Sequence, residues 1–164
     1  MELGSIRPME EADWPSVAEI YRQGIATNLA TFQSECPEYE QWDKAHRQDC
    51  RLVLTEGERI AGWAALSPVS ARSVYSGVAE VSIYLDEGCR GKGLGAALLR
   101  ALVAAAEAQG CWTLQSGIMR DNLPSIRLHE KCGFRMVGYR EKIGRDRFGS
   151  WRGTVLMERR SGEV

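Results

Sequence analysis

The segment CRGKGLGAALL, residues 89–99, restricts what this chain can be more than any other part of it. Glycines stand at positions 91, 93 and 95, and an alanine- and leucine-rich pattern typical of a helix follows them directly. Glycine-rich turns leave backbone N–H groups open, and the N-terminus of the following helix carries partial positive charge. Because Arg90 and Lys92 lie in the same loop, the segment predicts an anion site, most simply for a phosphate group.

Two common phosphate-binding loops do not match this segment. A Walker A loop requires Lys-Ser or Lys-Thr after its last glycine, but Gly95 is followed by Ala96 and Ala97. A dinucleotide-binding loop requires Gly-x-Gly-x-x-Gly and an acidic residue about 20 residues later. The spacing here is Gly-x-Gly-x-Gly, and no such acid follows Gln109-Gly110. The sequence therefore disfavours both a nucleotide triphosphatase and a dinucleotide-binding fold.

Length and charge narrow the remaining classes. A chain of 164 residues without repeats or linkers is expected to form one domain over residues 1–164. The net charge of −1 gives no general attraction for nucleic acid, so anion binding must be local and no nucleic-acid partner is expected. No segment has the length of a signal peptide or membrane span, so we expect a cytoplasmic location and no membrane partner.

The cysteines and histidines do not suggest a metal site. The five cysteines are odd in number and form no Cys-x-x-Cys pair, and the chain has two histidines. We therefore expect free thiols, no disulfide framework and no bound metal.

Hydrophobic periodicity and turn residues predict a mixed α/β chain. Helices are expected over about 13–27, 37–48, 93–109 and 123–132, with Asp13 capping the first and Asn122 the last. Strands are expected over about 3–8, 51–56, 59–67, 78–86, 112–118, 134–139 and 149–159. The order β-α-α-β-β-β-α-β-α-β-β lacks the regular alternation of a doubly wound fold, so the sequence predicts a mixed sheet flanked by helices.

Several segments together resemble one known family. AEVSIYLD (79–86) followed by CRGKGLGAALL resembles the acyl-CoA-binding core of the GNAT superfamily of N-acetyltransferases, whose loop reads Q/R-x-x-G-x-G/A. NLPSIRLHEKCGF (122–134) resembles a segment of the branch that acetylates phosphinothricin and methionine sulfoximine. ATFQSECPEYEQW, ARSVY and FGSW also resemble that branch, so the similarity spans about residues 5–157. The resemblance implies the GNAT-like fold, a mostly antiparallel twisted sheet flanked by helices, and acetyl-CoA as co-substrate without a metal.

The resemblance also indicates where acetyl-CoA would bind. The pyrophosphate would lie over the glycine loop, backbone N–H groups near Ser82–Leu85 would bind the oxyanion, and the start of the last helix would contact the pantetheine arm. The expected binding residues are Ile83, Tyr84, Leu85, Arg90, Gly91, Lys92, Gly93, Leu94, Gly95, Ala96, Asn122 and Ser125. From the residues alone, Lys92 is equally well an exposed loop lysine, and Asn122 is sufficiently explained as a helix cap.

Two residues are expected to act in catalysis. An amine is mostly ammonium at neutral pH, so a base must remove a proton before the amine attacks a thioester. Glu80 interrupts an otherwise apolar strand, where desolvation would raise its pKa from about 4.3. In the resembled branch this glutamate is the proposed base, acting through water, and His129 lies near the acceptor amine. The alternatives are that Glu80 is an outward-facing strand residue and that His129 is a structural helix residue.

The acceptor site is expected around Arg72 and Tyr75, which resemble the Ala-Arg-x-x-Tyr of that branch. An arginine fork suits the carboxylate of an amino acid or the phosphinate of a mimic. Phe32 and Trp151 are expected to wall the pocket, although both also fit a structural role.

The pattern departs from the branch close to this arginine. Phosphinothricin enzymes typically have a basic residue two positions earlier and Asp-Trp after the tyrosine, where this chain has Ser70 and Ser76-Gly77. We therefore expect direct acetyl transfer in a ternary complex to a small amino acid or its sulfone, sulfoximine or phosphinate analogue, with its exact identity open. The alternatives are another amine acceptor (a protein N-terminus, a polyamine or an aminoglycoside) and a non-catalytic acyl-CoA-binding module. Family members are often dimers, so the resemblance leaves room for a homodimer.

Overall fold

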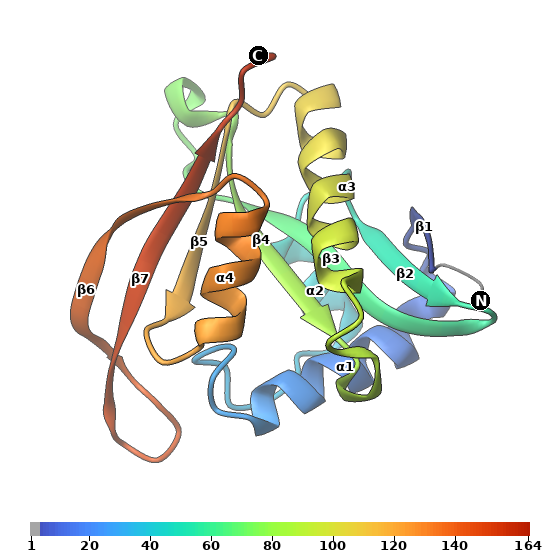
Figure 1. Ribbon diagram of the computed structural model, residues 1–164, viewed down its shortest axis with the longest axis horizontal. Helices are drawn as coiled ribbons and strands as arrows, with labels where there is room; N and C mark the ends of the chain where they lie inside the picture. Colours follow the sequence, from blue (N-terminus) through green and yellow to red (C-terminus); the bar gives the residue numbers. More distant parts are fainter. Residues whose placement is uncertain (1–3) are drawn as a thin grey trace.

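The computed structural model describes residues 4–164, which form one seven-stranded sheet with helices on both faces (Figure 1). The helices are α1 (Trp14–Ala26), α2 (Tyr39–Ala45), α3 (Leu94–Ala108) and α4 (Leu123–Lys131). The strands are β1 (Ser5–Pro8), β2 (Leu52–Glu56), β3 (Arg59–Pro68), β4 (Val78–Leu85), β5 (Thr113–Met119), β6 (Arg135–Arg145) and β7 (Trp151–Arg160). The predicted order of helices and strands is confirmed. Leu3, placed in the first strand by the sequence, lies outside the described residues.

The sheet is mixed and mostly antiparallel, as predicted. Its strand order is β1-β2-β3-β4-β5-β7-β6, and β4–β5 is the parallel pair. The β6–β7 hairpin forms one edge of the sheet, in orange and red in Figure 1. Pairing with β7 carries β6 through Arg145, well beyond the predicted end at residue 139.

Two apolar clusters cover the two faces of the sheet. Helix α3 buries Leu98, Leu99 and Leu102 against one face, where α4 also packs. Helices α1 and α2 cover the other face with a cluster of aromatic rings that includes Trp42 and Trp63. Strand β4 lies between the clusters, which explains why its sequence is apolar almost throughout.

The cap predicted for α1 is wrong in detail. Asp13 stands at the N-cap position but makes no side-chain hydrogen bond to the helix. Its carboxylate instead accepts two hydrogen bonds from the Arg7 guanidinium, each 2.8 Å long, and one from the backbone N–H of Glu10. These bonds hold the pKa of Asp13 below its usual range. A charged partner on β1 thus outcompetes the helix for this carboxylate.

The divergence of β4 and β5 creates the opening in which the site lies. The two strands pair only at Val78–Glu80 with Thr113–Gln115, although β4 continues to Leu85 and β5 to Met119. Beyond Glu80, the side of β4 that faces β5 has no strand partner. Its main-chain N–H and C=O groups are therefore available to a molecule that enters between the strands.

Candidate active site

A cavity of about 500 Å³ lies between the glycine loop, the end of β4 and α4. Gly91 and Gly93 adopt left-handed backbone angles, with φ of +80° and +76°, and Gly93 directly precedes the 15-residue helix α3. Gly93, Gly95 and Ala96 line the cavity, so the positive N-terminal end of α3 lies at its wall, which suits a pyrophosphate.

Gly95 serves a different purpose from the two turn glycines. A Cβ at this position would lie 3.2 Å from the Leu85 side chain and 3.4 Å from that of Leu128. Its absence lets the first turn of α3 pack closely against β4 and α4. The residues present thus fit an acyl-CoA: an open backbone for the phosphates and a cleft between β4 and α4 for the extended arm.

Most of the predicted acyl-CoA residues line this cavity. Of the predicted set, Lys92 and Leu94 do not: Leu94 packs against the core, and Lys92 Nζ lies 3.8 Å from Glu56 Oε2. The sequence prediction missed residues at the end of α1 and on α4. These are Gly24, Thr27, Leu29, Ala30, Pro124, Leu128 and Lys131. Residues 124, 128 and 131 are spaced to lie on one face of a helix, so the sequence could have predicted that they line the cavity together. No local sequence pattern connects the end of α1 with the glycine loop.

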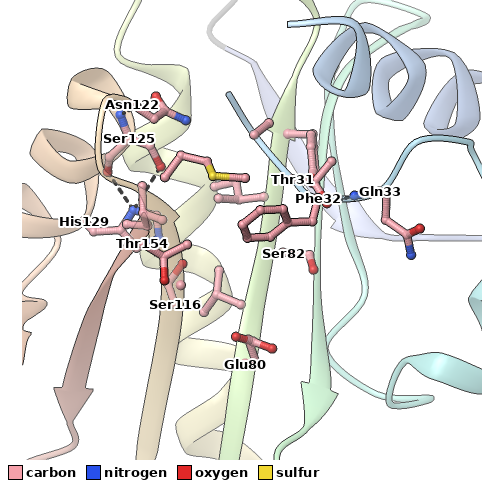
Figure 2. A pocket seen from close by; sticks show the side chains of 17 residues that line it. Thr31, Phe32, Gln33, Glu80, Ser82, Ser116, Asn122, Ser125, His129 and Thr154 are labelled. Atoms are coloured by element: carbon pink, nitrogen blue, oxygen red, sulfur yellow. Dashed lines mark hydrogen bonds between the residues drawn. The ribbon is translucent and has the colours of Figure 1, made fainter. Parts of the chain in front are cut away.

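A second cavity of about 470 Å³ opens between the diverging strands β4 and β5. Figure 2 shows Glu80 and Ser82 on β4, with Gln33 on one side of them and Ser125, His129 and Thr154 on the other. The two cavities share five lining residues, which are Ala30, Ile83, Tyr84, Asn122 and Ser125. A molecule in the first cavity can therefore reach the second at the point where the strands separate.

Glu80 projects into the second cavity beside Gly117 of β5. Its Oε1 lies 3.9 Å from where a Cβ on Gly117 would stand, so the glycine leaves room for the carboxylate. Solvent reaches Glu80 through the open mouth of the cavity, yet the surrounding protein removes enough water to raise the pKa of the carboxyl. The positive charge of Arg140 opposes this rise. A raised pKa suits a carboxylate that removes a proton near neutral pH.

His129 is buried, with 1% of its surface exposed, and it also lines the second cavity. Its Nδ1 lies 2.7 Å from the backbone oxygen of Ser125, which can only accept, so the proton resides on Nδ1. Nε2 is then an acceptor, and it has no hydrogen-bond partner within residues 4–164. Burial lowers the pKa of the ring, which favours its neutral form.

The predicted acceptor residues are only partly brought together. Phe32 lines the second cavity, but Arg72, Tyr75 and Trp151 do not. Arg72 lies over the ring of Tyr75, 5.6 Å from its centre, and both side chains are exposed. Trp151 is exposed beneath Arg145, three residues before Thr154 on a strand whose side chains alternate, so it faces away from the cavity. Within the described chain, these three residues do not line the second cavity.

A buried polar network fixes the loop that carries Phe32. The Asp146 carboxylate accepts hydrogen bonds from the Asn28 side chain, from Arg152 and from the backbone N–H groups of Phe148 and Ser150. Arg152 also donates to the backbone oxygen of Asn28 and forms a two-bond ion pair with Asp121. These contacts connect the turn between β6 and β7 with the segment after α1.

Comparisons with known proteins show the family to which the chain belongs. Residues 12–134 match the model of the Acetyltransferase (GNAT) family. The chain is 31% identical to phosphinothricin N-acetyltransferase of Streptomyces coelicolor over 162 residues, covering 94% of each chain. It is 30% identical over 161 residues to the L-methionine sulfoximine/L-methionine sulfone acetyltransferase of Pseudomonas aeruginosa, covering 94% of this chain and 92% of that one.

A solved structure shows the same likeness in three dimensions. The GNAT superfamily phosphinothricin acetyltransferase of Sinorhizobium meliloti, in complex with acetyl-CoA, superposes with a TM-score of 0.87 at 30% identity. The alignment covers 98% of this chain and 89% of that one. The fold, the glycine loop and the strand divergence define an acyl-CoA-binding acyltransferase architecture. The chain belongs to the GNAT acetyltransferase family.

Two further observations concern other functional classes. Within residues 4–164, no group of three or more His, Cys, Asp or Glu side chains is arranged to hold a metal ion. No helix in the same part of the chain is long and apolar enough to cross a membrane.

Proposed function

We propose that this protein transfers the acetyl group of acetyl-CoA to the α-amino group of a small amino acid or of an analogue such as phosphinothricin, methionine sulfoximine or methionine sulfone. The observation that carries the proposal is the junction of the two cavities at the β4–β5 opening, with Glu80 on the acceptor side. The names of the relatives support the acceptor class. Among the described residues no cysteine lines either cavity, which supports direct transfer within a ternary complex.

Glu80 acts as the general base. Directly or through a water molecule, its carboxylate takes a proton from the acceptor ammonium. Acetyl-CoA supplies a thioester carbonyl that the freed amine can attack. The new N–C bond forms, the C–S bond breaks and the sulfur leaves with its electron pair, taking up a proton to become the CoA thiol. The partly desolvated setting of Glu80 supports this role, because it brings the pKa of the base closer to neutral pH.

The unpaired side of β4 binds the oxyanion that forms during attack. Backbone N–H groups beyond Glu80 have no strand partner in β5, so they need no rearrangement to donate to developing negative charge. Asn122 and Ser125 position the reacting arm, since both line the two cavities where they meet. Asn122 does this while capping α4: its side chain accepts from Ser125 N–H at 3.4 Å.

His129 orients the acceptor rather than acting as a charged acid. Its neutral ring stands at the wall of the second cavity, while Nε2 is shielded from solvent by the surrounding protein, so the ring shapes the wall against which the acceptor lies.

The deciding experiment measures CoA thiol release from acetyl-CoA with a panel of amines. The panel contains phosphinothricin, methionine sulfoximine, methionine sulfone, common amino acids, a polyamine, an aminoglycoside and a peptide N-terminus. Saturable turnover with the amino acid analogues is expected. Turnover confined to the polyamine, aminoglycoside or peptide contradicts the acceptor class, and tight acetyl-CoA binding without turnover identifies a non-catalytic binding module.

The proposal also includes the domain organisation, the oligomeric state and the cellular location of the protein. Residues 1–164 act as one GNAT-like domain, consistent with the family match and the single sheet. The edge strand β6 exposes Met136, Val137, Tyr139 and Ile143, a surface suited to a homodimer contact. Sedimentation tests this contact: the wild type is expected to be a dimer and Val137→Lys a monomer.

The cytoplasm is the expected location because acetyl-CoA is available there, and cell fractionation tests it.

A further inference from the structure

An amino acid acceptor brings a carboxylate into a cavity that contains Glu80. The cavity between β4 and β5 is lined by no lysine or arginine among the described residues. Arg72, the cation expected from the sequence, lies over Tyr75 and outside the cavity. The acceptor carboxylate therefore needs a cation from the rim of the cavity.

The register of three strands brings Arg140 to this rim. Met119 of β5 stands directly opposite Thr154 of β7, and Thr154 stands directly opposite Arg140 of β6. Directly opposed residues of antiparallel strands project from the same face of the sheet. Since Met119 and Thr154 both line the acceptor cavity, the Arg140 side chain leaves β6 on the cavity side.

Charge and exposure agree with this placement. The positive charge of Arg140 is felt at Glu80, where it opposes the rise in the pKa of the carboxyl. Within one protomer, Arg140 is exposed and forms no ion pair among residues 4–164, so its guanidinium can donate hydrogen bonds to a ligand. Strand β6 lies two strands from β5, about 10 Å at the usual spacing, and an extended arginine spans much of that gap.

Three other arginines of the β6–β7 hairpin are occupied or face elsewhere. Arg152 is held by Asp121 and Asp146, and Arg135 is paired with Glu158. Arg145 stands opposite Trp151 and lies over its ring, 4.5 Å from the centre, on the face away from the cavity. Among the arginines of the β6–β7 hairpin, Arg140 combines an unpaired side chain with a position on the cavity face.

We propose that Arg140 binds the carboxylate of the amino acid acceptor and thereby selects amines that carry a carboxylate, an inference that rests on the proposed function. The planar guanidinium forms two parallel hydrogen bonds with the carboxylate. The α-amino group then points toward Glu80 and the junction of the cavities. The acceptor side chain extends toward Phe32, which lines the same cavity.

The test compares methionine sulfone with its carboxamide, which keeps the amine and loses the negative charge. Kinetics are measured for the wild type, Arg140→Met, Arg140→Lys and the matched control Arg145→Met. Arg140→Met is expected to raise KM for methionine sulfone about 10- to 100-fold while kcat stays within about twofold. KM for the carboxamide and for acetyl-CoA should stay unchanged in this variant. Arg140→Lys recovers part of the loss, and Arg145→Met behaves as wild type.

The outcomes separate this inference from the proposed function. If the wild type acetylates methionine sulfone and Arg140→Met changes KM for neither acceptor, or for both equally, the carboxylate contact is overturned and the function stands. If the wild type acetylates only amines without a carboxylate, or no amine at all, both are overturned. An unchanged KM for acetyl-CoA shows that the variants are folded. If Arg140→Met does not fold, the same comparison with Arg140→Gln decides between these outcomes.

Discussion

The ring of Phe32 packs directly against Gly144: a Cβ on this glycine would lie 3.0 Å from two ring atoms. Phe32 belongs to the segment after α1, and Gly144 to the far part of β6. Because Phe32 also lines the cavity between β4 and β5, the glycine sets how far the ring stands back from the space proposed for the acceptor.

Gly144→Val is therefore expected to push the Phe32 ring into the acceptor cavity. We expect KM for the amino acid acceptor to rise roughly 10-fold, because a hydrophobic pocket responds to shifts of methyl size by about this factor. KM for acetyl-CoA should change little, since Phe32 does not line that cavity. Gly138→Val is the matched control on the same strand, where a Cβ meets no heavy atom within 4 Å. Equal effects of the two substitutions contradict the role given to the ring.

Glu80→Gln tests the base. The variant should bind acetyl-CoA normally and lose about 10²- to 10⁴-fold in kcat, the usual contribution of a general base. The base must be ionised to act, and desolvation raises its pKa. The acid limb of the wild-type profile of kcat/KM against pH should therefore lie above the ordinary glutamate pKa of about 4.3.

The profile also provides an internal check on Glu80. In Glu80→Gln the acid limb should disappear, whereas Glu158→Gln, a carboxylate elsewhere on the sheet that pairs with Arg135, should retain it. An unchanged limb in Glu80→Gln assigns the proton transfer to another group.

Gly93→Val tests the glycine loop. Both Gly93 and Gly57 have left-handed φ angles, of +76° and +61°, and a Cβ at either position would meet no heavy atom within 4 Å. Valine at either position stores about 1–3 kcal/mol of backbone strain. Only Gly93→Val should abolish acetyl-CoA binding in calorimetric titration, because Gly57 lies in the β2–β3 turn. Retained binding in Gly93→Val removes the loop from the phosphate site.

Most helices and strands could be predicted from the sequence because each depends on patterns among neighbouring residues. The alternating and apolar strand patterns, the Ala/Leu-rich helix after the glycines and the Asn122 cap each depend on a few neighbouring residues. The cap expected of Asp13 was wrong because Arg7, on another element, competes for its carboxylate. No local pattern reports such a partner.

The candidate site could be predicted only in part, because some of its residues are placed by contacts between distant parts of the sequence. Glu80 stood out as a carboxylate in an apolar strand, and it lines the cavity between β4 and β5. Most of the glycine loop lines the other cavity, and the binding roles of these residues remain predictions. Arg140 and Thr154 carry no motif, because their positions at the cavity depend on the register of β5, β7 and β6. For Arg72 the local pattern was misleading. This residue stands in a segment that resembles the family, yet it does not line the cavity between β4 and β5.

Asp146→Asn tests whether the network behind Phe32 positions the acceptor loop. The asparagine oxygen can still accept from the Phe148 and Ser150 N–H groups, but its NH₂ group would face the donors of Asn28 and Arg152. We expect a lower Tm and a higher KM for the acceptor, with KM for acetyl-CoA less affected. Asp121→Asn is the control, because the Asp121 side chain is 61% exposed and its loss should matter less.

The shift in the pKa of Asp146 determines how the stability difference between wild type and Asp146→Asn should change with pH. Hydrogen bonds, led by that from Asn28, lower the pKa of Asp146 in the folded protein. A carboxyl whose folded pKa is depressed stabilises the protein above its unfolded pKa, about 3.9, and loses that contribution as pH falls through the folded pKa. The Tm difference between wild type and Asp146→Asn should therefore be full above about pH 5 and shrink below about pH 4. A difference that stays constant across this range shows that the ionised form of Asp146 does not hold the loop.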